Sequence, residues 1–234
     1  MKDKLMNYVP MILNNDLIAL KQALVNDPTL LNYQASAGAS RENADDYFYP
    51  SINRYVYQGD TLLHIAAAAF QSEIVAFLLE SGADVHLKNR LGAQCLHYGA
   101  DNHHNLHLTA ENQTKTLKTI LDFNADPNAF DKNGVAPLHR AVRTRAYHAC
   151  GVLIDGGADP LLANRRGSTP LHLAVQTTGR GYQDLDAAHH SQALIIELLV
   201  ANGAQFTDCD AKGISVKTLI QSDWIKQRFL PDAD

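Results

Sequence analysis

The chain has 234 residues, 46% of them hydrophobic, and carries a formal net charge of −5. This length suffices for one folded domain, and the surplus of acidic groups argues against general affinity for nucleic acid. No run of about 18 apolar residues occurs, so we expect no membrane-spanning helix. The start of the sequence lacks the hydrophobic region of a signal peptide, and the cysteines Cys95, Cys150 and Cys209 are an odd number at unrelated positions. We therefore expect a cytoplasmic protein without a disulfide framework.

Apolar residues at helical spacing predict two short helices within the first 33 residues, over residues 4–13 and 15–24. The stretch that follows, residues 34–58, is rich in aromatic side chains, and we call it the finger. A disordered linker would be poor in aromatics, so we expect the finger to be ordered and folded against the residues that follow it. Two roles stay open for these side chains, packing of the finger and contact with a partner. They are Tyr47, Phe48, Tyr49, Tyr55 and Tyr57.

A tetrapeptide with the pattern Thr-x-Leu-His then returns at a fixed phase. Its copies occupy residues 61–64, 94–97, 136–139 and 169–172, and each begins two residues after a glycine. The steps from Gly59 to Gly92 and from Gly134 to Gly167 both measure 33 residues. Threonine suits the N-cap of a helix, proline suits its first turn, and leucine begins an apolar face. The pattern therefore predicts short helices that begin at or near Leu62, Cys95, Pro137 and Pro170.

An aliphatic pattern follows the tetrapeptides and predicts a second helix in each copy. In the first copy it reads Ile74-Val75-x-x-Leu78-Leu79, which is helical spacing with one apolar face. A glycine, or asparagine in the second copy, then fits a left-handed helix end. The residues at this place are Gly82, Asn124, Gly157 and Gly203.

In these motifs and in the 33-residue period, the sequence strongly resembles the ankyrin-repeat family, over nearly the whole chain. The resemblance implies an all-α solenoid in which inner and outer helices stack in pairs with hairpin loops between them. We assign one domain, residues 1–234, with repeats at 59–91, 92–133, 134–166 and 167–212. Degenerate capping repeats at 1–33 and 213–234 enclose them, because terminal repeats face solvent on one side. The resemblance also implies that the motif histidines hydrogen-bond to backbone and tie adjacent repeats together; they are His64, His97, His139 and His172.

Two repeats are longer than the period, and their extra residues fall between the inner and outer helix, at about 101–113 and 178–190. Insertions of this kind often lie on a binding face. The first contains His103, His104 and His107, which raises the alternative of an enzyme or metal site on the insertions. Zinc sites usually show Cys-x-x-Cys or His-Glu-x-x-His spacing, and neither occurs. We therefore expect no bound metal, no cofactor and no catalytic residue.

The resemblance implies that the hairpin tips and the exposed side of the inner helices form a concave surface that binds a partner protein. Many of the matching positions are basic although the chain as a whole is acidic, and arginine suits bidentate recognition of carboxylate or phosphate groups. We therefore predict a monomeric, non-catalytic interaction module that binds an acidic or anionic segment of a partner. The predicted contact residues are Arg90, Tyr98, Lys132, Arg140, Arg143, Arg165, Arg166, Leu173 and Gln176, with Tyr47, Phe48 and Tyr49 of the finger.

Two alternatives to this interpretation stay open. In the first, the basic positions form an ordinary solvated surface in which arginines pair with neighbouring acids such as Asp131 or Asp159. In the second, the module is a secreted effector that engages a host protein rather than a housekeeping adaptor.

Overall fold

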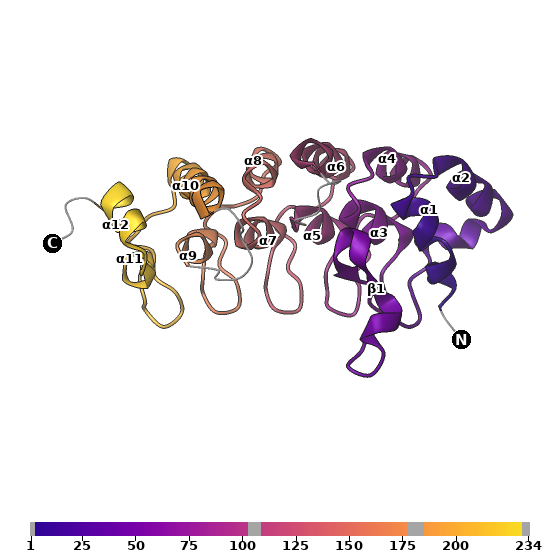
Figure 1. Cartoon of the computed structure of the whole chain (residues 1–234), viewed down its shortest axis with the longest axis horizontal. Coiled ribbons are helices and arrows are strands. Elements are labelled where there is room, and N and C mark those ends of the chain that lie inside the picture. The colour runs from indigo at the N-terminus through magenta and orange to yellow at the C-terminus, as the bar shows by residue number, and fades with distance from the viewer. Residues whose placement is uncertain (1–2, 103–108, 177–184, 231–234) are drawn as a thin grey trace.

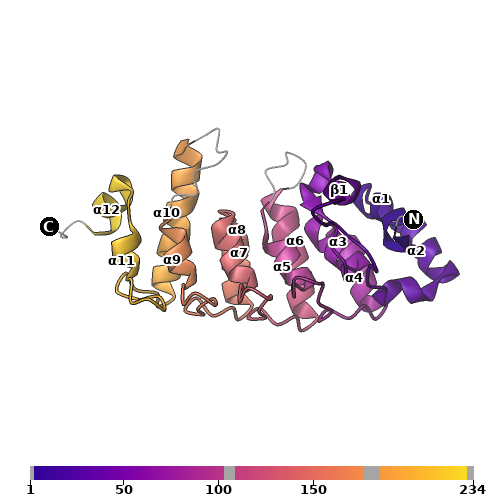
Figure 2. The same cartoon turned by 90° about the horizontal axis from the view of Figure 1, so that it is seen from below.

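Helix pairs stand side by side in one row that runs from the N-terminus to the C-terminus (Figure 1). The computed structural model describes residues 3–102, 109–176 and 185–230. Inner helices form one layer, outer helices form a second, and hairpin loops leave the row at one end of the helices (Figure 2). This arrangement confirms the predicted all-α solenoid. The pairs are α3 (Leu62–Ala68) with α4 (Ser72–Glu80), α5 (Cys95–Ala100) with α6 (Ala110–Asp122), α7 (Pro137–Arg143) with α8 (Tyr147–Asp155), and α9 (Pro170–Ala174) with α10 (Leu185–Ala201).

All four inner helices begin at the residue predicted from the tetrapeptides. The start of α3 shows the local reason. The hydroxyl of Thr61 accepts a hydrogen bond from the backbone N–H of His64 at 3.4 Å, and the Thr61 N–H donates to His64 Nδ1 at 3.2 Å. This reciprocal pair satisfies two N–H groups that a helix start otherwise leaves without partners.

The core lies between the two helix layers and continues from one repeat to the next. Leu138 of α7 is 2% exposed, and Ile74 and Leu78 of α4 are fully buried. Gly99 of α5 permits close stacking, because a Cβ at this position would lie 3.2 Å from the side chain of Leu117 in α6. Each repeat therefore buries its apolar surface against its neighbours, as in other solenoids.

Neighbouring hairpins contact each other through their backbones. The N–H of Lys132 donates to the carbonyl of Leu91 at 2.9 Å, which joins two successive hairpins. Gly134 has a φ of +70°, and a Cβ at this position would lie 2.7 Å from the backbone nitrogen of Arg165. Both the left-handed backbone and the approach of the next hairpin require glycine here. The contact between successive hairpins therefore explains why glycine stands at this place in the hairpin.

Three of the four motif histidines join their repeat to the next, as the family resemblance implies. Nδ1 of His97 accepts a hydrogen bond from the Gln94 N–H at 3.2 Å, so Nε2 carries the hydrogen and donates to the carbonyl of Val135 at 3.1 Å. The histidines of the first and third repeats make the equivalent contact at 3.1 and 3.2 Å. In the fourth repeat, Nε2 of the buried His172 has no hydrogen-bond partner among the described residues.

A shorter helix pair lies at each end of the row. Across the three described stretches of chain, none of the helices combines the length and the hydropathy needed to cross a bilayer. The N-terminal elements are η1 (Lys4–Asn7), α1 (Val9–Leu13), α2 (Leu17–Asn26) and η2 (Pro28–Asn32), and the C-terminal pair is α11 (Val216–Leu219) and α12 (Asp223–Phe229).

The finger lies on the inner side of the row and crosses α3 (Figure 2). It contains a two-stranded antiparallel sheet in which Phe48 is opposite Tyr55 and Tyr49 is opposite Arg54. Val56, which follows the second strand, is fully buried and belongs to the core of the row. The finger is therefore an ordered part of the molecule, with a sheet that the sequence analysis did not predict. Its elements are η3 (Ala44–Tyr47), β1 (Phe48–Tyr49), η4 (Pro50–Ile52) and β2 (Arg54–Tyr55).

The two insertions contribute to the outer helices that follow them. Residues 110–113 form the first turn of α6, and residues 185–190 form the first turns of α10. The segments expected as inserted loops are therefore partly helical. Residues 103–108 and 177–184 lie outside the part of the chain that the structure describes.

Candidate protein-binding surface

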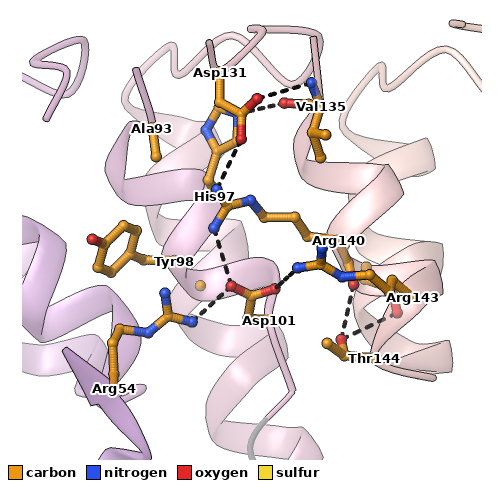
Figure 3. A network of polar contacts seen from close by, with 12 residues as sticks. Arg54, Ala93, His97, Tyr98, Asp101, Asp131, Val135, Arg140, Arg143 and Thr144 are labelled. Carbon is orange, nitrogen blue, oxygen red and sulfur yellow. Dashed lines mark hydrogen bonds and ion pairs between the residues drawn. The ribbon is translucent and has the colours of Figure 1, made fainter. Parts of the chain in front are cut away.

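Three arginine side chains converge on one buried carboxylate at the end of α5 (Figure 3). This carboxylate belongs to Asp101, which is 7% exposed. Its Oδ2 accepts hydrogen bonds from Arg54 Nη2 of β2 at 2.7 Å and from Arg140 Nη1 of α7 at 3.1 Å. Arg143 Nη2 of α7 lies 3.9 Å from Oδ1. Asp101 therefore joins the finger to the second and third repeats.

The charges around Asp101 outweigh the effect of its burial. Burial raises the pKa of this carboxyl, but the positive charges of Arg54 and Arg140 lower the pKa to about 2. Asp131, on the hairpin before α7, pairs with Arg140 at 3.0 Å. Burial raises the pKa of Asp131 as well, and hydrogen bonds from the Val135 N–H and from Arg140 lower it overall. Both carboxylates are therefore ionised at neutral pH, and Arg140 bridges them.

Tyr98, which we predicted as a partner contact, is buried beside this network, and the prediction is wrong. Tyr98 is 1% exposed, and the guanidinium of Arg54 lies 4.3 Å from the centroid of its ring. The Tyr98 hydroxyl donates to Asp60 Oδ2 at 3.0 Å and accepts from Asn89 Nδ2 at 2.9 Å. The finger covers this position of the inner face, because Arg54 occupies the place over the aromatic ring.

Arg140 is also not the exposed partner contact that we predicted. Its side chain is 11% exposed, whereas that of Arg143 on the same helix is 59% exposed. Arg140 points toward the acids Asp101 and Asp131, so the alternative of internal pairing is correct for this arginine. We therefore assign Arg140 to the packing of the repeats and keep Arg143 as a candidate contact.

The finger also engages Arg90 on the hairpin before α5. Arg90 Nη2 donates to the carbonyl of Ala39 at 2.5 Å, and its guanidinium lies 5.1 Å from the centroid of the Tyr57 ring. Although Arg90 is exposed, its guanidinium already has partners in the finger. Arg90 therefore has a structural role that the sequence did not indicate. Its contact with a partner stays a prediction.

The finger aromatics predicted as partner contacts differ in exposure. Tyr47 is 6% exposed, so a contact between its side chain and a partner is excluded and its role is packing. Phe48 and Tyr49 are half-buried. The ring of Phe48 packs on Tyr55 with 4.8 Å between centroids, and the Tyr49 hydroxyl donates to the sulfur of Met6 at 3.6 Å. Contact of Phe48 and Tyr49 with a partner stays a prediction.

A pocket of about 600 Å³ lies where α7 and α9 meet the hairpins that precede them. Arg143, Arg165 and Arg166 line it, and all three side chains are exposed. Among the residues that the structure describes, none that lines the pocket is acidic. Among the described residues, neither Arg165 nor Arg166 forms an ion pair with a carboxylate. We call this site the arginine pocket; its lining residues are Asn133, Val135, His139, Arg143, Asn164, Arg165, Arg166 and Leu173.

Equivalent positions in two repeats explain the surplus of positive charge in the arginine pocket. In the third repeat, Arg140 of the inner helix pairs with Asp131 of the preceding hairpin. In the fourth repeat, the residues at the same distances from the motif glycine are Leu173 and Asn164, which are uncharged. These two positions of the fourth repeat therefore supply no acid to the arginines of its own hairpin.

The remaining predicted contacts, Lys132 and Gln176, are exposed outside the lining of the pocket. Lys132 lies on the hairpin before α7, and Gln176 lies just after α9, where its backbone carbonyl accepts a hydrogen bond from Arg145 at 2.7 Å. Both stay predictions as partner contacts.

Two residues that organise this surface, Arg54 and Asp101, were missed by the sequence analysis. Asp101 was assigned to an insertion, although it lies nine residues after Gly92, as Arg143 lies nine residues after Gly134. The stacking of equivalent positions was therefore a usable signal for the contact between Asp101 and Arg143. Nothing in the motifs determines how the finger lies against the row, so Arg54 had no such signal.

In the stretches that the structure describes, no three His, Cys, Asp or Glu side chains are grouped so that they could hold a metal ion. The histidines of the enzyme or metal alternative, His103, His104 and His107, lie outside those stretches.

Comparisons with known proteins agree with this architecture. A family model described as ankyrin repeats (3 copies) matches residues 106–210, and one described as ankyrin repeat matches residues 58–90. An ankyrin repeat protein of Acanthamoeba polyphaga mimivirus is 30% identical over 89 residues, which are 38% of this chain and 19% of that protein. An ankyrin repeat protein of Fowlpox virus (strain NVSL) is 31% identical over 107 residues, which cover 36% of this chain and 76% of that protein. Ankyrin repeats indicate a protein-interaction module and are generally non-catalytic, and the chain belongs to the ankyrin-repeat family.

Proposed function

We propose that this chain binds an acidic segment of a partner protein in the arginine pocket. The observation that carries the proposal is that three exposed arginines line one pocket whose described lining contains no acidic residue. Like charges held close together raise the free energy unless an anion lies near them. An acidic segment supplies that anion, and the planar guanidinium can accept it in a bidentate geometry.

The neighbouring acid cannot neutralise the pocket. Asp101 is 3.9 Å from Arg143, but the same carboxylate already pairs with Arg54 at 2.7 Å and with Arg140 at 3.1 Å. One negative charge is therefore shared among three guanidinium groups. The exposed side chain of Arg143 is left with most of its charge available to a ligand.

The position of the finger limits where the partner binds. The finger crosses the inner side of α3, and its Arg54 covers Tyr98 of α5. In the third and fourth repeats the arginines of the pocket are exposed, with half-buried Leu173 beside them. We therefore propose a segment whose acidic residues meet the arginines and whose adjacent apolar residue meets Leu173.

Selection from a displayed library of random peptides tests this proposal without knowledge of the natural partner. We expect the wild-type chain to enrich peptides with clustered Asp and Glu. The double variant Arg165→Glu, Arg166→Glu should lose that enrichment, because it reverses two charges of the pocket. Lys212→Glu is the matched control, since Lys212 is exposed on the next hairpin at the position equivalent to Arg166. Selected peptides without acidic residues, or equal enrichment by the double variant, would contradict the proposal.

A second candidate function is an effector that engages a host protein through the same pocket. Both relatives described above are viral proteins, which is compatible with this role. The test is capture from host-cell extract with the wild-type chain and with Arg165→Glu; a host protein retained only by the wild type supports this function.

We also propose a cytoplasmic location, supported by three cysteines that are all unpaired.

A further inference from the structure

We infer that the segment bound in the arginine pocket carries a phosphorylated side chain. This inference rests on the proposed function and specifies its ligand. A phosphoserine or phosphothreonine bears a charge of about −2 near pH 7 and three acceptor oxygens, whereas one carboxylate bears a single charge and two oxygens. The pocket and its surroundings fit the larger charge and the larger number of acceptors.

The charges around the pocket are the first argument. In the pocket and the adjacent ion-pair network, guanidinium groups outnumber the carboxylates that pair with them. The unpaired positive charge lies on the three arginines of the pocket. A single carboxylate would leave most of this excess without a counter-charge. The guanidinium groups are those of Arg54, Arg140, Arg143, Arg165 and Arg166, and the carboxylates are those of Asp101 and Asp131.

Amide donors in the lining are the second argument. Oδ1 of Asn164 accepts hydrogen bonds from the backbone N–H groups of Arg166 at 2.8 Å and of Ser168 at 3.2 Å. Among the described residues, the side-chain amide nitrogen of Asn164 donates no hydrogen bond, so it keeps two hydrogens for a ligand. Asn133, also in the lining, is exposed. Neutral amides beside arginines add donors without adding charge, which suits a group with three acceptor oxygens.

Arg143 is placed to contact such a ligand at little cost to the fold. Its side chain is 59% exposed and lies 3.9 Å from Asp101, which is longer than a hydrogen bond. When Arg143 turns toward a ligand, Asp101 keeps Arg54 and Arg140 as partners. The ligand therefore gains a guanidinium without leaving a buried carboxylate unpaired.

A phosphorylated protein segment fits the site better than a lipid headgroup or a nucleic acid. The chain has a net charge of −5, which opposes its approach to an anionic membrane or to a phosphodiester backbone. The pocket includes apolar Leu173 and Val135 beside the arginines. These residues can contact the methyl group of phosphothreonine or an apolar neighbour in the segment.

The test compares short peptides of one sequence that carry phosphothreonine, glutamate or threonine at the centre, with leucine beside it. Binding to the full chain is measured by fluorescence anisotropy. We expect the phosphothreonine peptide to bind at least about tenfold more tightly than the glutamate peptide, and the threonine peptide not to bind. Arg166→Gln should lower the affinity for the phosphothreonine peptide at least about tenfold. The matched control Lys212→Gln should leave this affinity unchanged. Because the second phosphate pKa is about 6, its binding should also weaken between about pH 7.5 and about pH 5.5.

Equal affinity for the phosphothreonine and glutamate peptides would overturn the inference. It would not overturn the proposed function, which the peptide-library selection tests separately. Unchanged binding by Arg166→Gln would overturn it as well, since the phosphate would then bind elsewhere. Binding to vesicles that contain a phosphoinositide, lost in Arg166→Gln and without binding of the phosphothreonine peptide, would reassign the pocket to a lipid headgroup.

Discussion

The guanidinium of Arg54 and the carboxylate of Asp101 lie 2.7 Å apart, although 47 residues separate them in the chain. Their side chains are 12% and 10% exposed, so the ion pair is nearly shielded from water. It connects the finger to the end of α5 and holds Arg54 over Tyr98. An ion pair of this kind cannot open cheaply, because each partner would be left charged and poorly solvated. We therefore regard the finger as a fixed part of the inner face.

Replacement of Arg54 by alanine should lower the free energy of unfolding by about 3 kcal/mol. This value is at the low end for breaking a buried ion pair, because Asp101 keeps two other arginines. Chemical denaturation measures the change. Arg41→Ala is the matched control in the same finger; Arg41 is exposed, and we expect a change within about 0.5 kcal/mol. Equal effects of the two variants would show that the finger is not held by Arg54.

Replacement of Leu138 by alanine should destabilise the fold by about 2–5 kcal/mol, because this leucine is buried in the core between repeats. Gln176→Ala should change the stability by no more than about 0.5 kcal/mol, since its side chain is exposed. Calorimetry compares the two. Similar losses in both variants would mean that the inward and outward faces are wrongly assigned.

Stability should fall as the pH drops from about 6.5 toward 4. Burial, and next the charge of Arg140, lower the pKa of His97 to about 4 from an ordinary 6.5, and burial also lowers the pKa values of His64 and His139. Between these values the unfolded chain binds a proton that folded His97 does not, so acid favours unfolding by about 3 kcal/mol from His97 alone. Protonation of Asp101, whose pKa is about 2, lowers the stability only at still lower pH.

Urea unfolding at pH 7.5 and pH 5 measures this dependence. His97→Gln should make the stability less dependent on pH, and His148→Gln is the control because His148 is exposed. A stability that does not change between these two pH values would contradict the neutral, buried state of the motif histidines.

Thiol titration of the native protein should detect one fast-reacting cysteine of the three. Burial raises the pKa of Cys95 to about 12 and raises that of Cys150 as well, so neither forms a thiolate at neutral pH. Cys209 is exposed. Denaturant should release the other two thiols, and fast reaction of all three without denaturant would show that the repeats open readily.

The features predicted correctly from sequence are those whose causes lie within one repeat or between equivalent positions. The capping at Thr61, the left-handed helix end at Gly82 and the buried Leu138 all follow from the 33-residue pattern. Tyr98 and Arg140 were placed wrongly for a different reason. In the family pattern their positions face the concave surface, but Arg54 of the finger covers Tyr98, and Arg140 pairs with Asp101 and Asp131.

Arg54 belongs to the finger, and Asp101 was assigned to an insertion although it keeps the phase of the repeat. The finger has no counterpart in the other repeats, so no internal comparison of the sequence predicts how it lies against the row. The exposed arginines of the fourth hairpin, Arg165 and Arg166, were placed correctly because their neighbours belong to the repeat pattern itself.

The last prediction separates a structural arginine from a binding arginine. Arg140→Glu places a third carboxylate beside Asp101 and Asp131, which lie 3.1 and 3.0 Å from the present guanidinium. We expect this variant to lose at least about 3 kcal/mol of stability, because a buried pair becomes a buried repulsion. Arg165→Glu should change the stability by no more than about 0.5 kcal/mol, since Arg165 is exposed.

Binding of a selected acidic peptide should respond in the opposite order to stability. Arg165→Glu should lower the affinity for the peptide by about tenfold or more, which corresponds to about 1.4 kcal/mol of binding free energy, while the protein stays folded. For the wild type, affinity should fall as salt rises, because the screening length shortens from about 10 Å at 0.1 M to about 3 Å at 1 M. Affinity that is indifferent to salt and to Arg165→Glu would move the binding surface away from the arginine pocket, most plainly to Phe48 and Tyr49 of the finger. The peptide affinity and the melting temperature of the Arg165→Glu variant, measured together, therefore decide whether Arg165 contributes to binding or to stability.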